Sequence, residues 1–306
     1  MILTPNTQTD LHGFDEEFNN FVELFNKKKL PNKILLSGQK GIGKCTFAYH
    51  LINFVLSKGE EFSYNLNNLS INAENRSFKL IINGSNPNFN LIDVSPEKKS
   101  IDIAQIRTLI NNLNKSSFNS KPRFILIDNI EFLNLNSINA LLKVLEEPND
   151  NIFFILINNN RKVKSTLLSR CLNFKISLTN KKILEINNIL LKKNIYDLIN
   201  KDLINYYHTP GKIYALFKLS KEKNIDLKEV DLRNFLSVLI KDSFYKGDNI
   251  SKDIIYDFLE FYLLKKISVL YTDLYRYFIR RIDDTRKFNL DEDSLFLEIN
   301  SKLLNE

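Results

Sequence analysis

Short apolar runs and segments with helical periodicity alternate along the first part of the chain. The pattern predicts helices over about residues 14–28, 44–56, 102–113 and 134–147, the last stopped by Pro148. Continuous apolar runs predict strands at 34–36, 91–94, 124–128, 152–157 and 174–176. Strands without a polar face are typical of a parallel sheet covered on both sides. We therefore expect a doubly wound α/β domain that ends near residue 178.

The strand signals stop after this point. Residues 180–225 have the pattern of several short helices, and residues 228–306 that of longer amphipathic helices rich in Leu, Ile, Phe and Tyr. The polar, weakly periodic stretch 57–88 predicts an insertion with room for one helix. The expected organisation is an α/β domain over 1–178, followed by two helical regions over 179–226 and 227–306.

Composition and the length of the apolar runs argue against a membrane-spanning, a secreted or a zinc-binding protein. Of the 306 residues, 43% are hydrophobic and 26% are charged, which is ordinary for a globular protein. Apolar runs such as 152–157 are too short to span a bilayer, and the first residues lack the pattern of a signal peptide, so we expect a cytoplasmic protein with no membrane partner. Cys45, Cys171 and three histidines show no metal-ligand spacing, which predicts reduced thiols and no structural zinc.

The net charge of +7 has two interpretations. It is consistent with a basic surface that faces DNA. It is equally consistent with compositional drift, because the chain is rich in Lys, Ile and Asn and poor in Ala and Gly. Net charge alone leaves both open.

A glycine-rich loop between the first strand and the next helix is the strongest chemical signal. In the run 38–45, Gly38, Gly41 and Gly43 allow backbone N–H groups to point inward around the phosphates of a nucleotide. The helix that follows adds a favourable dipole at its N-terminus. Lys44 is expected to reach the β- and γ-phosphates. The segment predicts a P-loop.

Two departures from the usual pattern concern metal binding and hydrolysis. Cys45 stands where Ser or Thr normally offers a hydroxyl to magnesium, and Thr46 is rotated from that position by about 100° on a helix. Asp128, at the end of the third strand, is either a residue of the magnesium shell or a simple strand-end residue. The next residue is Asn129, whose amide cannot take a proton from water. Glu131 lies nearby, but the sequence does not say whether it points into the site.

The triplet Ser169-Arg170-Cys171 follows a short helix that begins near Val163. A lone arginine in such a place is commonly a solvated surface charge. The alternative is an arginine finger, whose planar charge stabilises a γ-phosphate bound by a neighbouring subunit. Spacing does not separate these alternatives.

Taken together, three segments resemble bacterial clamp-loader ATPases of the AAA+ class: residues 30–45 with the P-loop, residues 139–148 with Leu-Leu-Lys-x-Leu-Glu-Glu-Pro, and residues 167–171 with Ser-Arg-Cys. Within that class the delta-prime type is most similar. Gly-Ser-Asn-Pro-Asn at 84–88 resembles its stretch before the second strand, and Thr-Pro-Gly at 209–211 resembles its Ser-Pro-Gly.

This resemblance implies a P-loop AAA+ core with a parallel sheet, a small helical lid and an all-α collar that joins subunits into a ring. It implies ATP or ADP as the ligand, with magnesium near Asp128, and Arg170 as a finger acting in trans. Asn158 is similar in placement to the residue that senses the γ-phosphate. The implied partners are motor (gamma/tau) and delta subunits, the sliding clamp and primed DNA. Lys143, Glu146 and Glu147 mark where subunit or DNA contacts would lie, if that helix does more than pack.

The sequence also differs from the family pattern. The zinc-binding cysteines that many relatives carry do not occur in 57–88, and Cys45, Asn129 and the lack of an arginine near Gly211 weaken the case for hydrolysis. The hypothesis is therefore a largely non-catalytic clamp-loader subunit that helps ATP-dependent clamp loading. The alternatives are a motor subunit that uses Lys44 and Asp128, and a stand-alone P-loop protein.

Overall fold

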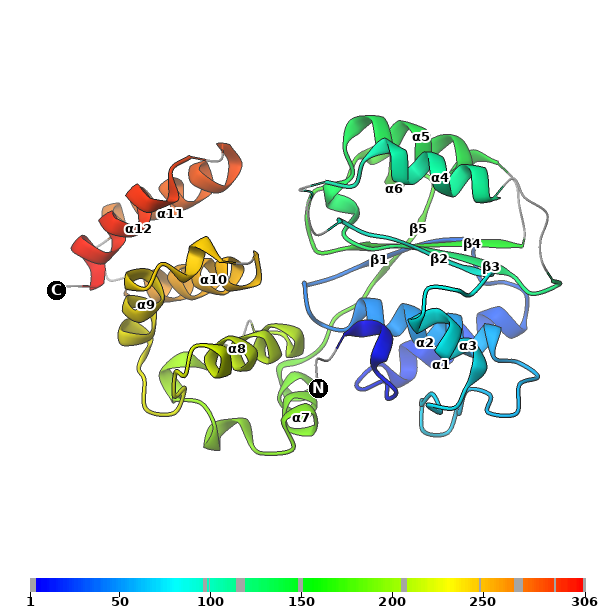
Figure 1. Ribbon diagram of the computed structural model, residues 1–306, viewed down its shortest axis with the longest axis horizontal. Coiled ribbons are helices and arrows are strands. Elements are labelled where there is room, and N and C mark those ends of the chain that lie inside the picture. The colour runs from blue at the N-terminus through cyan, green and yellow to red at the C-terminus, as the bar shows by residue number, and fades with distance from the viewer. Residues whose placement is uncertain are drawn as a thin grey trace. The chain divides into compact units, whose positions relative to one another are not determined.

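The computed structural model describes residues 4–95, 98, 100–113, 119–147, 151–204, 208–247, 249–266, 272–288 and 290–304. The chain forms two compact units, Met1–Lys182 and Ile183–Glu306. The first contains the sheet and the second is helical (Figure 1). The expected fold class, a parallel α/β domain followed by helices, is confirmed.

The first unit is built on a five-stranded sheet in the order β2-β3-β4-β1-β5. The strands are β1 (Lys33–Ser37), β2 (Phe89–Ile92), β3 (Arg123–Ile127), β4 (Ile152–Asn158) and β5 (Leu172–Lys175). All four pairings are parallel. β2 and β5 each begin two residues earlier than predicted, because pairing with the neighbouring strand sets the ends of an edge strand. Phe89, for example, lies opposite Phe124.

Helices cover both faces of this sheet (Figure 1). One face carries α1 (Asp15–Asn26), α2 (Lys44–Leu56) and α3 (Arg76–Ile82), and the other carries α4 (Ile103–Leu113), α5 (Leu135–Glu146) and α6 (Ser165–Leu168). Successive side chains of a strand point to opposite faces, so Leu36 joins the first core and Leu35 the second. Pro148, expected to stop α5, lies outside the described residues.

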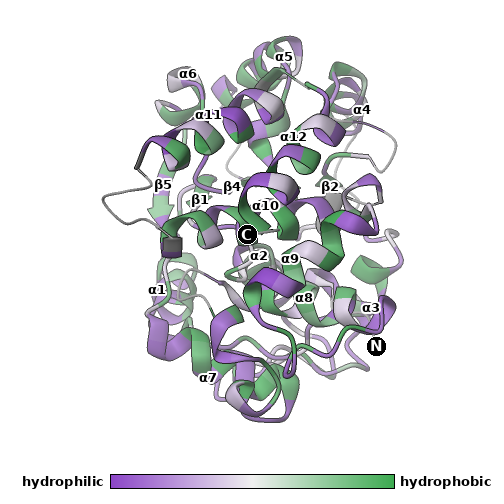
Figure 2. Cartoon of the chain, turned by 90° about the vertical axis from the view of Figure 1, so that its left-hand side faces the viewer, coloured by the Kyte–Doolittle hydropathy of each residue, from purple (hydrophilic) through white to green (hydrophobic). Residues whose placement is uncertain are grey.

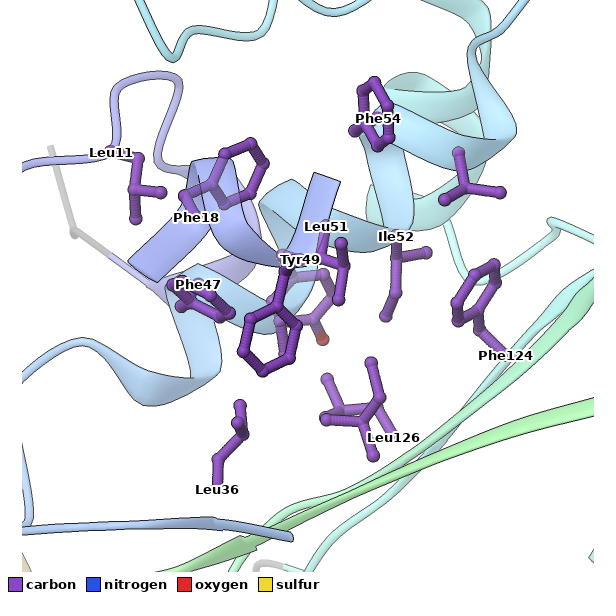
Figure 3. Packing of buried hydrophobic residues seen from close by; sticks show 14 of the residues in the cluster. Leu11, Phe18, Leu36, Phe47, Tyr49, Leu51, Ile52, Phe54, Phe124 and Leu126 are labelled. Carbon is purple, nitrogen blue, oxygen red and sulfur yellow. The ribbon is translucent and has the colours of Figure 1, made fainter. Parts of the chain in front are cut away.

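An aromatic cluster fixes the helix that follows the P-loop (Figure 3). Phe47, in α2, is fully buried and meets the rings of Phe14, Phe18 and Phe21 edge-on, with centroids 6.0, 5.5 and 5.2 Å away. Edge-to-face contacts of this kind stabilise a pair beyond the burial of its area. The first turn of α2 is therefore held against α1 by close packing.

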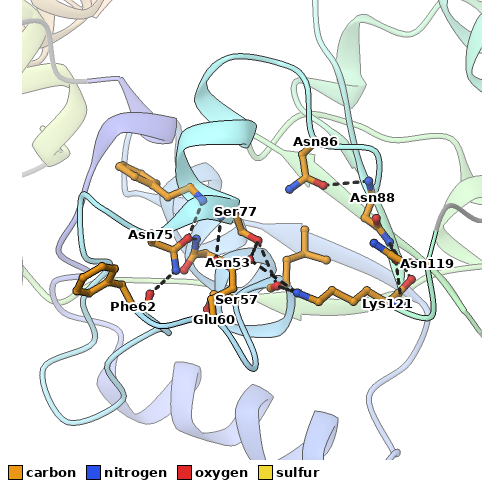
Figure 4. Close-up of polar contacts among 12 residues, drawn as sticks. Asn53, Ser57, Glu60, Phe62, Asn75, Ser77, Asn86, Asn88, Asn119 and Lys121 are labelled. Carbon is orange, nitrogen blue, oxygen red and sulfur yellow. Dashed lines mark hydrogen bonds and ion pairs between the residues drawn. The ribbon is translucent and has the colours of Figure 1, made fainter.

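A buried polar network organises the 57–88 insertion (Figure 4). Asn75 caps α3 by accepting from the Phe78 amide at 2.7 Å, and the same oxygen accepts from Asn53 Nδ2 at 3.0 Å. Its own Nδ2 donates to the Phe62 carbonyl at 2.5 Å. Asn53 and Asn75 are buried almost completely. Asn75 thus joins the insertion to α2 with one of its three hydrogen bonds and ties two parts of the insertion together with the other two.

A second group of contacts extends the network to the loop before β3 (Figure 4). Ser77 Oγ donates to Glu60 Oε1 at 2.6 Å, and Lys121 Nζ lies 3.7 Å from the same carboxylate oxygen. Lys121 also donates to the Leu56 carbonyl at 2.5 Å. The insertion, which contains α3 as the sequence predicted, is held by side-chain hydrogen bonds to segments on both sides.

The second unit is a set of amphipathic helices, whose hydrophobic and hydrophilic positions alternate in Figure 2. It contains most of α7 (Asn180–Leu191), with α8 (Pro210–Glu222), α9 (Leu232–Lys241), α10 (Asn249–Lys266), α11 (Thr272–Phe288) and α12 (Glu292–Ile299). One hydrophobic cluster runs from Ile195 to Leu304. The proposed boundary at 226 falls within the sequence range of this cluster, and the division into lid and collar stays a prediction.

Short turns of helix complete the described chain. The 3₁₀ helices are Pro5–Thr7, Ile130–Phe132, Ile195–Asp197, Lys201–Leu203 and Phe244–Lys246, and a π-helical turn covers Asn300–Leu304. Among the described residues, no helix combines the length and the hydrophobicity that a membrane crossing requires.

Replacing Asn75 with Ala should lower the free energy of unfolding by about 2–3 kcal/mol. The change removes the cap of α3 and leaves the buried Asn53 amide and Phe62 carbonyl without this partner. Urea unfolding followed by circular dichroism measures the effect. Asn67→Ala, at an exposed position of the same insertion, is the matched control and should change stability little. Equal stability of the two variants would contradict the structural role of the network.

Candidate phosphate-binding site

The loop between β1 and α2 has the backbone that a P-loop requires. Gly41 and Gly43 have φ angles of 83° and 102°, in the left-handed region that favours glycine. Gly38 is required for a different reason, because a Cβ at this position would lie 2.2 Å from the Ile176 carbonyl oxygen. Gly43 is the N-cap of α2, so the helix begins directly at Lys44. The three predicted glycines therefore each meet a steric demand.

Lys44 is almost fully buried at the centre of the site. Its Nζ donates to the carbonyl oxygens of Gly38 and Gln39 at 2.9 and 2.6 Å, and to Asn159 Oδ1 at 2.9 Å. All three acceptors are neutral. Burial lowers the pKa of Lys44 to about 8, although the nearby carboxylates of Asp128 and Glu131 oppose this shift. A bound phosphate would supply the countercharge that these three acceptors lack.

Two carboxylates follow adjacent strands at the same edge of the sheet. Asp93 comes directly after β2 and Asp128 directly after β3. Burial and the neighbouring charge of Asp93 raise the pKa of Asp128 to about 6, while the hydrogen bond from the Asn129 backbone and the charge of Lys44 oppose the rise. The sequence pattern did not identify Asp93 as a site residue, because it placed Asp93 inside a strand over residues 91–94. Its signal was the same as that of Asp128, an acidic residue at the end of an apolar run.

Cys45 occupies the position next to Lys44 and interacts with Asp128. Burial, reinforced by the negative charge of the nearby Asp128 carboxylate, raises the pKa of the Cys45 thiol well above its usual value. A neutral thiol is a poor ligand for magnesium, which prefers oxygen. Thr46, the next residue, is half-buried in the first turn of α2, and its role at the phosphates stays a prediction.

Asn159 connects the parts of the site. Besides accepting from Lys44, its Nδ2 donates to Asn129 Oδ1 at 2.8 Å and to Glu131 Oε1 at 2.9 Å. Asn129 in turn donates from Nδ2 to Asp93 Oδ1 at 2.8 Å. A continuous polar network therefore runs from the P-loop lysine to the end of β2, and it includes Glu131, whose direction the sequence left open.

Asn158 was expected near a γ-phosphate, and its side chain is engaged in its own loop. Its Nδ2 donates to the Arg161 carbonyl at 3.0 Å, and its Oδ1 accepts from the Arg161 amide at 3.2 Å. Its expected sensing role stays a prediction. Asn159 is the neighbour that contacts Lys44, and sequence reasoning missed it because residues 158–160 are all asparagine.

Arg170 lies after α6, next to the end of α5. Its Nε donates to Glu146 Oε1 at 2.9 Å, and its Nη1 donates to the Thr166 carbonyl at 3.0 Å. About a third of the side chain is exposed. Arg170 takes no part in the network around Lys44 and belongs to a separate surface of the same unit. Cys171, beside it, and Cys45 are free thiols.

Within the described part of the chain, no three or more His, Cys, Asp or Glu side chains are grouped so that they could hold a metal ion. Asp93 and Glu131 instead accept hydrogen bonds from asparagine side-chain amides, and Asp128 accepts one from the Asn129 backbone. The residues present fit a phosphate better than a tightly held magnesium ion.

Asp128→Asn should stabilise the free chain at neutral pH. The pKa of Asp128 is about 6 in the folded chain, whereas an aspartate in an unfolded chain has a pKa near 4. Ionised Asp128 therefore lowers the free energy of unfolding. This loss of stability is fully present above about pH 6 and is absent below about pH 4. Allowing for partial exposure, we expect a gain of about 1–2 kcal/mol at pH 7.5 that disappears at pH 4.

Thermal unfolding of Asp128→Asn and of the natural chain across this pH range measures the difference. Glu61→Gln removes an exposed carboxylate in the same unit and should show no such pH-dependent gain. A gain for Asp128→Asn that is equal at pH 4 and pH 7.5 would show that ionisation of Asp128 is not the cause.

Comparison with known proteins identifies the family. Residues 14–180, which are 167 of the 306, match the protein family described as "DNA polymerase III, delta subunit". The DNA polymerase III subunit gamma of Buchnera aphidicola subsp. Schizaphis graminum is 30% identical over 70% of this chain and 58% of its own length. The subunit delta' of Bacillus subtilis is 32% identical over 47% of this chain and 42% of its own length.

Among solved structures, the DNA polymerase III gamma subunit-related protein of Thermotoga maritima is similar at 15% identity with a TM-score of 0.39, covering 85% of this chain and 76% of that protein. This chain spans about half the length of the two relatives above. The matches include both gamma and delta' subunits. Because the family match covers more than half of the sequence, the chain belongs to the DNA polymerase III delta-subunit family.

Proposed function

We propose that this chain is a delta-prime-type subunit that holds a nucleotide with little hydrolysis of its own and lends Arg170 to a neighbouring subunit. In this role it helps ATP-dependent loading of a sliding clamp on primed DNA, together with motor and delta subunits. The observation that carries the proposal is the buried Cys45 thiol beside the Asp128 carboxylate, which stands where a hydrolytic site would hold magnesium.

The P-loop supports nucleotide binding. Gly41 and Gly43 have the backbone that aims N–H groups inward, and the N-terminus of α2 adds positive potential. ATP or ADP would supply phosphate charge to the buried Lys44 ammonium, whose three hydrogen bonds to Gly38, Gln39 and Asn159 all go to neutral oxygens. The lack of a side chain at Gly38 allows the loop to pack closely against the Ile176 carbonyl, directly after β5.

The residues around the P-loop are poorly suited to activating water. Asn129 follows Asp128, and both ends of its amide are engaged, one with Asp93 and one with Asn159. An amide has no basic site for the proton of an attacking water. Thr209, Pro210 and Gly211 form the start of α8, so an arginine does not occupy this helix start. These features favour a holding site over a hydrolytic one.

The surroundings of Arg170 support a role at a subunit interface. Leu168 and Leu172, on either side of it in the sequence, are 41% and 55% exposed. Arginine next to exposed apolar side chains is typical of the residues that dominate protein interfaces. A guanidinium placed there can stabilise negative charge that develops on a phosphate bound by the adjoining subunit.

A motor subunit is the second candidate, and the position of Glu131 favours it. Its carboxylate is hydrogen-bonded to Asn159, which also contacts Lys44, so a carboxylate does lie within the network of the site. A general base needs this kind of proximity. Matches to gamma subunits are compatible with this candidate, and turnover by the isolated chain decides between the two.

Cys45→Thr should make nucleotide binding more dependent on magnesium. The natural chain is expected to bind ATP with similar affinity in magnesium and in EDTA and to turn it over slowly, because a thiol is a weak magnesium ligand. The hydroxyl of Thr should tighten binding in magnesium by roughly tenfold, or 1.4 kcal/mol.

Titration with a fluorescent ATP analogue measures this, with Cys45→Ala as the control that adds no ligand and Lys44→Ala as the variant expected to lose binding. Rapid hydrolysis by the natural isolated chain, abolished in Lys44→Ala, would contradict the holding site and favour the motor candidate.

Arg170→Ala should reduce the ATPase rate of the assembled complex while leaving assembly intact. Loss of a finger typically slows the site that it serves by several orders of magnitude, so we expect a fall of roughly tenfold or more in the share contributed by that site. Steady-state ATPase of the reconstituted complex and gel filtration measure both properties. Lys162→Ala, an exposed cation in the loop before α6, should leave turnover unchanged. Unchanged turnover in Arg170→Ala would exclude the finger role.

A further inference from the structure

In the free subunit the Arg170 guanidinium is already engaged. Nε and Nη2 both donate to Oε1 of Glu146, and Nη1 donates to the Thr166 carbonyl at 3.0 Å and to Ser169 Oγ at 3.3 Å. These four bonds use four of the five N–H groups that a guanidinium carries. Arg170 is therefore held by its own subunit.

The edge of the guanidinium that holds Glu146 is one of the two edges through which arginine can bind a phosphate, and both edges include Nη2. Nε and Nη2 form one side of the fork with which arginine binds a carboxylate or a phosphate through two parallel bonds. Both of these nitrogens are bonded to Glu146. A phosphate of a neighbouring subunit and the Glu146 carboxylate therefore compete for the same donors.

We propose that Glu146 is a latch that keeps Arg170 on its own subunit until a neighbour offers a phosphate. This inference rests on the proposed function of Arg170 and adds a residue that regulates it. Glu146 is the last residue of α5, and Arg170 follows α6 on the same face of the sheet. The two helices bring the residues together across 24 positions of sequence.

The exposure of the pair fits a latch that opens readily. The side chains of Arg170 and Glu146 are 33% and 56% exposed. Ion pairs with this much solvent contact are weak and are screened by salt. A phosphate carries more negative charge than one carboxylate, so a nucleotide bound by the neighbouring subunit can displace Glu146 from Arg170. The pairing with Glu146 still lowers, by a small factor, the fraction of Arg170 that is free to bind that phosphate.

The latch has a second consequence for the free subunit. A released guanidinium between the exposed side chains of Leu168 and Leu172 would be a ready contact for any phosphate or nucleic acid. Pairing with Glu146 neutralises that charge locally. Arg170 is then selective for a phosphate presented in fixed geometry by an assembled neighbour.

The first test measures the ATPase rate of the reconstituted complex with Glu146→Gln, at low salt. The variant keeps the shape of the side chain and removes its charge, so the rate should rise two- to fivefold, and the difference from the natural complex should shrink as salt is added. Glu61→Gln, on an exposed carboxylate of the 57–88 insertion, is the control and should leave the rate unchanged. A fall in the rate for Glu146→Gln would overturn the latch, because Glu146 would then support the working position of Arg170.

A double variant shows whether the effect passes through Arg170. Glu146→Gln should have no effect on the rate in an Arg170→Ala complex, because the residue that it releases is absent. A rise of the same size in that background would overturn the proposal.

A second test uses the free chain and does not depend on the finger role. Hydrogen exchange of the Arg170 Nε–H, followed by ¹⁵N NMR, should be two- to fivefold faster in Glu146→Gln than in the natural chain and unchanged in Glu147→Gln. Equal exchange in all three chains would overturn the latch. Faster exchange in Glu146→Gln together with full ATPase activity of Arg170→Ala would instead support the latch and refute the proposed function.

Discussion

The parallel register of the sheet is the constraint on which the rest of this site depends. Ser37 at the end of β1 lies opposite Asn158 at the end of β4, and opposite Lys175 at the end of β5. Parallel strands deliver their following residues to one edge, where ligands of open α/β sheets bind. A shift of β4 by one residue would turn its side chains to the other face of the sheet and remove Asn159 from Lys44.

This edge gathers charged groups under a covered sheet, and burial changes their chemistry. Lys44 and Asp128 both have pKa values displaced toward neutrality, because burial disfavours the charged form of each. Asn129, next to Asp128, adopts a left-handed backbone with φ of 54°, which asparagine tolerates better than most residues. Perturbed and strained groups of this kind cluster where ligands bind. The fold therefore maintains a polar site whose charged groups are costly to bury.

The surface that carries Arg170 is exposed to solvent, in contrast to the buried site around Lys44 and Asp128. An arginine that serves another subunit has to remain near solvent, so its partners are weak, and its neighbours Leu168 and Leu172 remain exposed. In our proposal the chain contributes to a neighbour's chemistry through this surface while its own P-loop holds a nucleotide. Both surfaces are attached to the same sheet, because α2 follows β1, whereas α6 lies between β4 and β5 in the chain.

Much of the fold was predictable from the sequence because the local signals are strong. Apolar runs at 124–128 and 152–157 marked strands that are buried on both faces, and Gly41 and Gly43 marked a loop with positive φ angles. These features depend on residues close in sequence, which is why periodicity and glycine placement sufficed. The edge strands were less certain, since their ends depend on a partner: β2 begins at Phe89 because it pairs with β3.

The tertiary structure alone decided which polar side chains meet. The sequence by itself determined a P-loop with Lys44 and Cys45, and the family resemblance drew attention to Arg170. The sequence could not distinguish Asn159 from Asn158, because three asparagines in a row carry the same local signal. Only the turn after β4 points their side chains to different partners, Lys44 for Asn159 and Arg161 for Asn158. The sequence could not reveal the pairing of Arg170 with Glu146 either, since the two residues are 24 positions apart and a strand lies between them. Contacts between residues distant in the chain depend on the packing of whole helices against the sheet, and local patterns do not encode that packing.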